Sequence, residues 1–361
     1  MKTEISSLEL YFLSKELQEI EFSRIEKIYQ WEKENIIFRI YTPEGKKHLR
    51  INMPGIVYFT EQPYQTLETP PGFCTFLRKY ISGSTIQKIY QKDFERILIL
   101  EFKSIKYGEL YLIIELIKPG NVILAKKEEQ KLITINSLER KRYKDRIIQA
   151  RHEYSFPESR PNIVELTTKE ISKIILESDK DLVKILALDL GLGGTYSEEI
   201  LKRANIDKRK KVTEETANSV ASEVKKILKE KLKPFKKENE VFPINMLTQD
   251  KEIEFKTFSE AIDSVVPQIK GKKTKKDSIV SKTERMIKAQ TKRLKQLEKE
   301  SVEAQKAGEY IYEHYQEFEN LINQVNELRK EKSFKEIKEL LKKNKHFKEL
   351  IEKEKKIVLE F

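Results

Sequence analysis

The sequence predicts an α+β protein with three successive parts: an antiparallel β-sandwich that carries two helices, a helical domain, and one long charged helix. Three observations lead to this prediction. Short apolar runs joined by hairpin-length loops fill the first part, helical spacing and a glycine-rich turn mark the second, and a heptad pattern runs through the third. The length of 361 residues fits two or three domains, and we place them at residues 1–175, 176–272 and 273–361.

Two helices are expected in the first part. An amphipathic helix near the N-terminus is predicted by apolar residues at helical spacing, namely Ile5, Leu8, Phe12, Leu13 and Leu17. A second helix in "PPGFCTFLRKYISG" gathers large apolar side chains on one face, namely Phe73, Phe76, Leu77, Tyr80 and Ile81. Ser82-Gly83 can end this helix. Cys74 lies on its apolar side and is expected to be a small core residue, not a nucleophile.

The strands of the first part are short apolar runs bounded by charge or by turn residues. They are "NIIFRIY", "HLRIN", "GIVYFT", "RILILEF", "ELYLIIEL", "NVILA" and "KLITIN". Loops of hairpin length, such as "TPEGKK", "KSIKYG" and "KKEEQ", join neighbouring runs, so the sheet should be antiparallel. The β unit is expected to end near residues 156–161, "FPESRP".

The second part has the pattern of helix, glycine-rich turn and helix. "KDLVKILALDL" reads as an amphipathic helix that "GLGG" stops, and "TYSEEILKRA" restarts the chain with Thr195 and Glu198 at capping-box spacing. Backbone N–H groups at such a restart can bind a phosphate, which makes Gly193, Gly194 and Thr195 candidate RNA contacts. The alternative is a plain helical hairpin that needs glycine for its bend. A further helix is expected in "TEETANSVASEVKKILKEKL", and a little β structure and a short helix in "FPINML" and "IEFKTFSEAID".

The third part begins after a basic linker, "KGKKTKKDS" (residues 270–278), and is expected to be one long helix. Its heptad core positions are Ile287, Gln290, Leu294, Leu297, Ser301, Ala304, Gly308, Ile311, Tyr315, Phe318, Ile322 and Val325. This series is apolar at both ends and weak in the middle. The pattern favours one arm of an antiparallel hairpin or a docking stalk, with a dimerising coiled coil as the alternative. The final "IVLEF" reads as a strand.

The charge balance favours a polyanionic partner. Charged residues make up 36% of the chain, and 71 basic against 59 acidic residues give a formal net charge of +12. Lysine and arginine gain affinity for nucleic acids by releasing counterions from phosphates. The alternative is a basic protein without such a partner.

Cysteine, histidine and hydropathy patterns indicate the compartment. Cys74 is the sole cysteine, so no internal disulfide can form and a reducing compartment is expected. The four histidines lie far apart in the sequence, so no zinc site is expected. Acidic residues and Lys15 interrupt the N-terminal apolar pattern, which argues against a signal peptide, and no apolar run reaches the roughly 20 residues of a membrane span. We expect a cytoplasmic protein without a membrane partner.

Six segments, in order, resemble those of a known family. They are "ISSLELYFLSKEL", "PPGFCTFLRKYI", "DFERILILEF", "PGNVILA", "LGLGGTYSEEILKRANID" and "TFSEAID". The chain resembles, over nearly its whole length, the NFACT family of ribosome-associated quality-control factors, some of which have been described as fibronectin-binding proteins. The resemblance implies a first domain with the fold of the formamidopyrimidine-DNA glycosylases, then a helix-hairpin-helix domain and a coiled-coil middle domain. It also implies that this chain stops inside the middle domain.

The glycosylase-like fold raises the question of enzymatic activity. Those enzymes attack with an N-terminal proline amine, and most of them grip DNA with a zinc finger. Here Lys2 and Thr3 follow Met1, and no cysteine cluster is present. We therefore expect neither glycosylase chemistry nor a metal or other cofactor.

The resemblance implies a binding function instead. The family's factors bind an obstructed large ribosomal subunit that still carries peptidyl-tRNA, and thus its rRNA, and recruit aminoacylated tRNA. The subunit's own active centre then adds a C-terminal tail to the stalled chain. Two alternatives remain: a coiled-coil interaction or adhesion protein, and a generic nucleic-acid-binding protein without tailing activity.

The resemblance also implies a tRNA site at Glu9, Glu95 and Arg96. Arg96 matches the family's arginine, whereas both acidic positions are aspartate in the family pattern and carry one more methylene here. Arginine can pair with phosphate or stack on a base, and a carboxylate can accept from base amines or a ribose hydroxyl. Because adjacent strand residues point to opposite faces, Glu95 and Arg96 should not pair with each other, but an ion pair of Glu9 with Arg96 is an alternative. Arg78 and Lys79 could contact RNA backbone or be ordinary surface bases.

Overall fold

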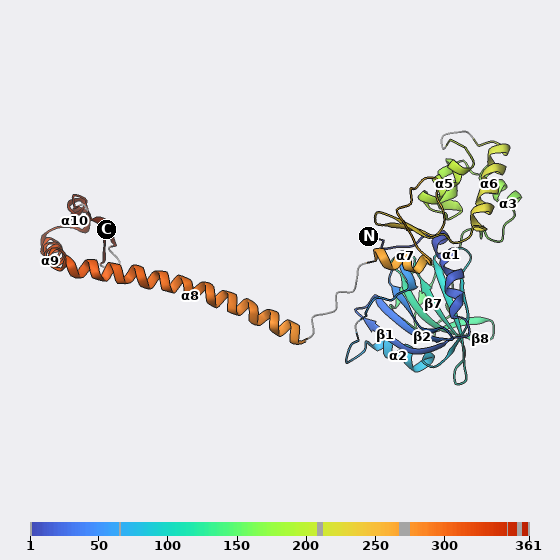
Figure 1. Ribbon diagram of the computed structural model, residues 1–361, viewed down its shortest axis with the longest axis horizontal. Coiled ribbons are helices and arrows are strands. Elements are labelled where there is room, and N and C mark those ends of the chain that lie inside the picture. Colours follow the sequence, from blue (N-terminus) through green and yellow to red (C-terminus); the bar gives the residue numbers. More distant parts are fainter. Residues whose placement is uncertain are drawn as a thin grey trace. The chain divides into compact units, whose positions relative to one another are not determined.

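The computed structural model describes residues 2–64, 66–207, 212–266, 275–344, 346–351 and 356–359. The chain divides into two compact units, Met1–Lys272 and Lys273–Phe361 (Figure 1). Among the described residues, no helix is both long enough and apolar enough to span a bilayer.

The first unit is built on one nine-stranded antiparallel sheet with the order β4-β3-β2-β1-β5-β6-β7-β8-β9. Its strands are β1 (Arg24–Trp31), β2 (Asn35–Thr42), β3 (Gly45–Asn52), β4 (Ile56–Phe59), β5 (Thr85–Gln91), β6 (Ile97–Ser104), β7 (Gly108–Glu115), β8 (Asn121–Glu128) and β9 (Lys131–Ser137). Seven of these coincide with predicted runs and pair through the predicted hairpins, which confirms an antiparallel α+β fold. The sequence reading missed β1 and β5. Each contains a register shift, between Ile25 and Lys27 and between Ile86 and Lys88, which disrupts the alternation of apolar and polar residues.

The predicted β-sandwich takes the form of a single sheet with two halves. Strands β1 and β5 are paired in register only at Arg24 and Thr85. One buried cluster nevertheless contains side chains from both halves, such as Phe38 and Leu49 from β2 and β3 and Leu100 from β6. The two halves therefore share one core while remaining joined at β1 and β5.

Helix α1 (Ser7–Leu17) is buried on two sides. Leu10 and Leu17 pack into the core of the sheet, whereas Leu8 and Phe12 pack into a second cluster formed by the helical part of this unit. The helix therefore forms as predicted, but it is not amphipathic in the expected way, because it is covered on two sides and not on one. A short 3₁₀ turn, η1 (Gln18–Ile20), follows α1.

Helix α2 (Gly72–Ile81) packs on the sheet as predicted. Cys74, Leu77 and Ile81 are buried in the core, which confirms Cys74 as a core residue. Burial raises the pKa of the Cys74 thiol above its usual value. Ser82 is the C-cap of the helix, and Gly83 follows in a left-handed conformation with φ of +77°.

The helical part of the first unit lies at one end of the sheet (Figure 1). Its helices are α3 (Thr168–Leu176), α4 (Leu182–Lys184), the π-helical turn η2 (Ile185–Asp189), α5 (Gly194–Arg203), α6 (Glu214–Leu228) and α7 (Phe258–Val265). The small sheet β13-β12-β14 (Glu240–Phe242, Phe235–Lys237, Ile253–Glu254) accompanies them. The hairpin β10-β11 (Lys141–Arg142, Ile147–Ile148) instead packs on the large sheet, where Ile148 joins a buried cluster with Ile97 and Ile123. Helix α3 shares buried residues with α6, so the expected division at residue 175 falls inside α3.

The restart after the glycine-rich turn differs from the prediction in its cap. Helix α5 begins at Gly194 with Gly193 as its N-cap, and no side chain among the described residues provides a capping hydrogen bond. The predicted capping box of Thr195 and Glu198 is therefore wrong. Glycine at 193 adopts φ of +76°, a conformation that disfavours the side chains able to cap.

The second unit contains helices α8 (Lys275–Glu313), α9 (Tyr315–Glu331) and α10 (Phe334–Leu341) and the hairpin β15-β16 (Phe347–Ile351, Lys356–Leu359). The expected single helix is interrupted at His314, which is the N-cap of α9. Its φ of −109° and ψ of 27° depart from helical values. Predicted heptad residues from Ile287 to Ile322 are largely exposed, whereas Val325 packs with Ile337 and Leu341. Residues 270–274 of the predicted linker lie outside the described residues.

Candidate functional site

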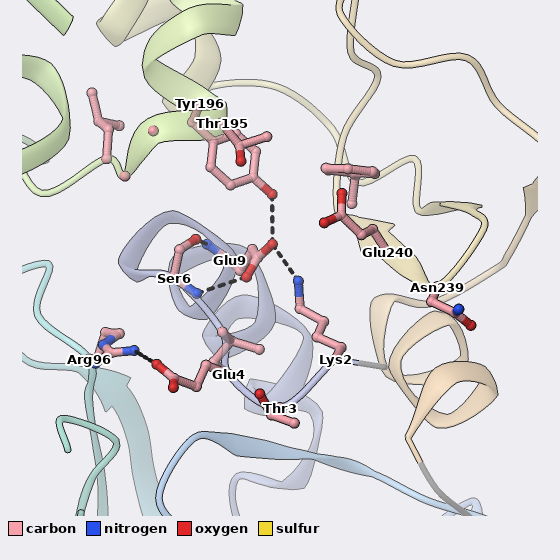
Figure 2. Close-up of a pocket in the computed structure, with 15 residues that line it drawn as sticks. Lys2, Thr3, Glu4, Ser6, Glu9, Arg96, Thr195, Tyr196, Asn239 and Glu240 are labelled. Atoms are coloured by element: carbon pink, nitrogen blue, oxygen red, sulfur yellow. Dashed lines mark hydrogen bonds and ion pairs between the residues drawn. The ribbon is translucent and has the colours of Figure 1, made fainter. Parts of the chain in front are cut away.

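A pocket of about 430 Å³ lies where the N-terminal segment, the start of β6 and the start of α5 meet (Figure 2). It is lined by residues 2–6, Glu9, Arg96, residues 192–196, Asn239, Glu240 and Phe242. The structure thus brings together Glu9 and Arg96 with Gly193, Gly194 and Thr195, which the sequence had suggested on separate grounds. The pocket has both positive and negative walls, because Lys2 and Arg96 line it together with Glu4, Glu9 and Glu240.

Glu9 holds three segments together at the floor of the pocket. Its Oε2 accepts a hydrogen bond from the Ser6 backbone N–H at 2.7 Å and completes the capping box of α1. Its Oε1 accepts from Lys2 Nζ at 2.7 Å and from the Tyr196 hydroxyl at 3.0 Å (Figure 2). Burial and then the neighbouring Glu9 charge raise the pKa of Tyr196 well above its usual range, so that hydroxyl keeps its proton. With both oxygens engaged and a side chain only 6% exposed, Glu9 positions its neighbours.

Arg96 pairs with a residue that the sequence reading did not consider. Its Nη1 donates to Glu4 Oε2 at 3.0 Å, so the alternative pair with Glu9 does not form (Figure 2). Glu4 also forms an ion pair with Lys118 through Oε1. Hydrogen bonds from Lys118 and then Arg96 lower the pKa of Glu4, which keeps this carboxylate ionised.

Glu95 pairs with Arg160 and is not among the residues that line this pocket. The Glu95 Oε1 accepts from the Arg160 backbone N–H at 3.0 Å and from Nε at 2.8 Å, while Nη2 donates to Oε2. Burial acts to raise the pKa of Glu95, but the hydrogen bonds from Arg160 outweigh it and leave that pKa lowered. The Arg160 guanidinium packs under Gly191, where an added Cβ would lie 3.0 Å from it. The pair therefore ties the start of β6 to the glycine-rich turn and positions the start of α5.

The start of α5 presents backbone donors to the pocket. The first N–H groups of a helix lack partners within the helix and carry a partial positive charge. Gly194 and Thr195 are exposed, and a Cβ at Gly193 or Gly194 would have nothing within 4 Å. An anionic group can therefore approach the backbone here.

Arg78 and Lys79 are not brought to this pocket. They lie on α2, which Figure 1 shows at the opposite end of the sheet from α5. Arg78 Nε donates to the Ile28 carbonyl at 2.7 Å, and its guanidinium lies over the Tyr29 ring. Lys79 is exposed, as expected of an ordinary basic side chain on the surface.

The sequence reading missed Lys2, Glu4, Lys118 and Arg160. Each is a single charged residue in a loop or segment without periodicity. Glu4, Lys118 and Arg160 act through partners far away in the sequence, whereas Lys2 pairs with Glu9 seven positions later. The only local signal was the alternation of Lys2 and Glu4 just before the α1 cap. The described residues contain no group of three or more His, Cys, Asp or Glu side chains placed to hold a metal ion.

Comparison with known proteins gives concordant matches. The family described as NFACT N-terminal and middle domains matches residues 6–358. The archaeal Rqc2 homolog aRqcH of Methanocaldococcus jannaschii is 29% identical over an alignment of 375 residues with gaps. The alignment covers 96% of this chain and 55% of the relative. The ribosome quality control complex subunit 2 of Saccharomyces cerevisiae is 33% identical over 127 residues, 34% of this chain and 12% of that protein. This chain therefore spans about half the length of the archaeal relative.

A solved structure matches the fold of most of this chain. It is the N-terminal part of the fibronectin/fibrinogen-binding protein from Streptococcus suis, with a TM-score of 0.61 and 22% identity. The match covers 72% of this chain and 98% of that structure.

Proposed function

The chain belongs to the NFACT family, and from this premise we propose that it is a ribosome-associated quality-control factor. It binds an obstructed large ribosomal subunit that carries peptidyl-tRNA and recruits aminoacylated tRNA for C-terminal tailing of the stalled chain. The names of the archaeal and yeast relatives support this role. The peptide bonds are formed by the subunit, so this chain contributes binding and orientation in the cytoplasm and is not itself an enzyme.

The proposal includes the family's domain plan. Residues 1–167 form the glycosylase-like sheet domain, and residues 168–272, which include α3, form a helix-hairpin-helix domain, because the expected boundary at residue 175 would divide α3. Residues 273–361 form the coiled-coil middle domain. The division between the two compact units at Lys272 and Lys273 supports the second boundary. Helix α8 contains 39 residues, a length of about 58 Å at 1.5 Å per residue, which suits an arm that reaches over rRNA.

One observation carries the tRNA part of the proposal: Arg96 and the exposed start of α5 line the same pocket. Arg96 uses Nη1 for Glu4, and its guanidinium has further N–H groups for a phosphate or a stacked base. The backbone N–H groups of Gly194 and Thr195 suit a second phosphate. Asn239 and Glu240 add donors and acceptors for a ribose hydroxyl or a base edge.

In this proposal Glu9 and Glu95 are positioning residues. Glu9 holds Lys2 and Tyr196, and Glu95 holds Arg160 under the glycine-rich turn. Each acts on the start of α5 from a different side. Replacing either one should therefore weaken tRNA binding through the geometry of the pocket.

The test measures binding of the full chain to aminoacylated tRNA and to purified large subunits across a salt series. Arg96→Ala is compared with Arg39→Ala, a matched control: Arg39 is a strand arginine, 19% exposed against 23% for Arg96, that pairs with Glu26 outside the pocket. We expect Arg96→Ala to lose tRNA binding and keep subunit binding, while Arg39→Ala keeps both.

Equal tRNA binding by Arg96→Ala and wild type would overturn the tRNA site. Binding to a protein partner that persists at high salt without RNA would favour an adhesion function instead. A preference for duplex DNA over tRNA would favour generic nucleic-acid binding, since phosphate contacts alone do not distinguish the two.

A further inference from the structure

Glu4 is held between two cations that come from different parts of the sheet. Arg96 lies at the start of β6 and donates to Glu4 Oε2 at 3.0 Å, and Lys118 follows β7 and pairs with Oε1. Each carboxylate oxygen thus has one cationic partner. The inference that follows rests on the proposed function, whereas the contacts of Glu4 do not.

We propose that Arg96 and Lys118 form a subsite for an RNA backbone phosphate, and that the Glu4 carboxylate fills this subsite in the free protein. A carboxylate and a phosphate both present acceptor oxygens that can pair with an arginine fork and a lysine ammonium. Binding of tRNA then exchanges the internal anion for an external one. Lys118 thereby becomes a tRNA-binding residue, and Glu4 becomes a competitor for the same two cations.

The backbones that carry the two cations are fixed relative to each other. The Leu116 backbone N–H donates to the Arg96 carbonyl at 2.8 Å, two residues before Lys118. Immediately after Lys118, the turn at Gly120 is packed so closely that an added Cβ would lie 2.6 Å from Pro54 Cβ. The subsite is therefore preorganised by main-chain packing, while the ends of the two side chains remain free to adjust.

The N-terminal segment packs on the turn between β3 and β4, which also packs against Gly120, and this places Glu4 beside the two cations. An added Cβ at Gly55 would lie 2.2 Å from the Thr3 carbonyl oxygen, and the Ile5 N–H donates to the Gly55 carbonyl at 3.0 Å. Lys2, at the other end of the segment, pairs with Glu9. Glu4 therefore reaches the cations from a backbone anchored on both sides.

The exposure of the three side chains allows the exchange. Glu4 is 30% exposed, Arg96 23% and Lys118 68%, so a phosphate can reach them from solvent. Partly solvated ion pairs contribute little net free energy, and a rotation of the Glu4 side chain is enough to open the subsite. The lowered pKa of Glu4 keeps the competing charge in place at neutral pH.

The experiment compares Glu4→Gln with Glu26→Gln in binding of the full chain to unfractionated tRNA. Glu26 is a suitable control because it is 34% exposed and pairs with Arg39 at 2.8 Å outside the pocket, so both variants gain the same net charge. We expect Glu4→Gln to bind about two- to fivefold more tightly than Glu26→Gln, the range for one partly solvated ion pair. We expect Lys118→Ala to bind more weakly than wild type, with a log–log salt slope reduced by about 0.7 to 0.9 for one lost phosphate contact.

Two outcomes would overturn the subsite: Glu4→Gln binding no more tightly than Glu26→Gln, or Lys118→Ala retaining wild-type affinity and salt slope. Weaker binding by Glu4→Gln would assign Glu4 to anchoring the N-terminal segment. These failures differ from failure of the proposed tRNA site. In that case Arg96→Ala itself would retain wild-type tRNA affinity.

Discussion

Glu16, near the end of α1, caps the start of α7 by accepting a hydrogen bond from the Phe258 backbone N–H at 2.7 Å, across 242 positions in the sequence. Its other oxygen accepts from the next N–H, that of Ser259, at 3.1 Å. A carboxylate at a helix N-terminus satisfies unpaired N–H groups and interacts favourably with the helix dipole. This contact fixes α7 against α1 although neither sequence contains a signal for the other.

Replacing Glu16 with Ala should therefore destabilise the first unit. We expect the free energy of unfolding to fall by about 1–2 kcal/mol, the range for loss of a helix cap. Urea denaturation of the full chain measures it. Glu19→Ala is the control, because Glu19 is 39% exposed, forms an ion pair with Lys47 and should change stability by less than about 1 kcal/mol. Equal effects of the two substitutions would contradict the capping role.

Replacing Glu95 with Gln should destabilise the protein in a manner that depends on pH. At pH 7 we expect a loss of about 1–3 kcal/mol, because the charged partner of Arg160 is removed. The pKa of Glu95 is lowered in the folded state from a usual value of 4.5. Its stabilising contribution is therefore present above pH 4.5 and is lost as the pH falls through the folded pKa. Unfolding free energies of both proteins from pH 7 to pH 3 should converge, and a constant difference would contradict the prediction.

Two glycines of one turn should respond oppositely to alanine. Gly191→Ala should destabilise the protein by about 1–3 kcal/mol, because φ is +71° and the added Cβ would press on the Arg160 guanidinium at 3.0 Å. Gly194→Ala should be neutral or stabilise by up to about 1 kcal/mol, because it begins α5 in open space. Thermal unfolding of the two variants measures this contrast. The same melting temperature for both variants would contradict the predicted clash between a Cβ at position 191 and the Arg160 guanidinium.

The small core of the second unit should depend on Ile337. This residue is 1% exposed and packs with Val325 and Leu341. Ile337→Ala should lower the free energy of unfolding of this unit by about 2–4 kcal/mol. Ile322→Ala, at a position 51% exposed, is the control and should have little effect. The rate of limited proteolysis between α9 and α10 provides the measurement, and similar rates for both variants would argue against this core.

Local patterns predicted the elements well and the contacts between them poorly. Seven strands and the ends of α2 followed from runs, turns and Ser82-Gly83, because these signals act within a few residues. Strands β1 and β5 were missed because bulges at Ile25 and Ile86 shift their alternation. The break at His314 was missed because neither histidine nor its neighbours disfavour a helix.

The sequence predicted several residues of the candidate site but not the ion pairs that they form. Arg96 and the glycine-rich turn were identified from the sequence, and the pocket contains both. Their partners were not, since Arg96 meets Glu4 across 92 positions and Glu95 meets Arg160 across 65. A single charged residue in a loop is not part of a periodic sequence pattern. Which residue it pairs with at such separations therefore depends on how the whole unit folds.

The two-sided burial of α1 has a consequence for biosynthesis. Residues 7–17 leave the ribosome before most of their packing partners, which include helices and turns up to α7 (Phe258–Val265). At a synthesis rate of about 5–20 residues per second, the helix waits about 12–50 s for the partner of Glu16 to be made. During that time the apolar side chains of α1 lack their final cover. Helix α1 is therefore synthesised well before α7, and its burial is completed only when α7 has been made.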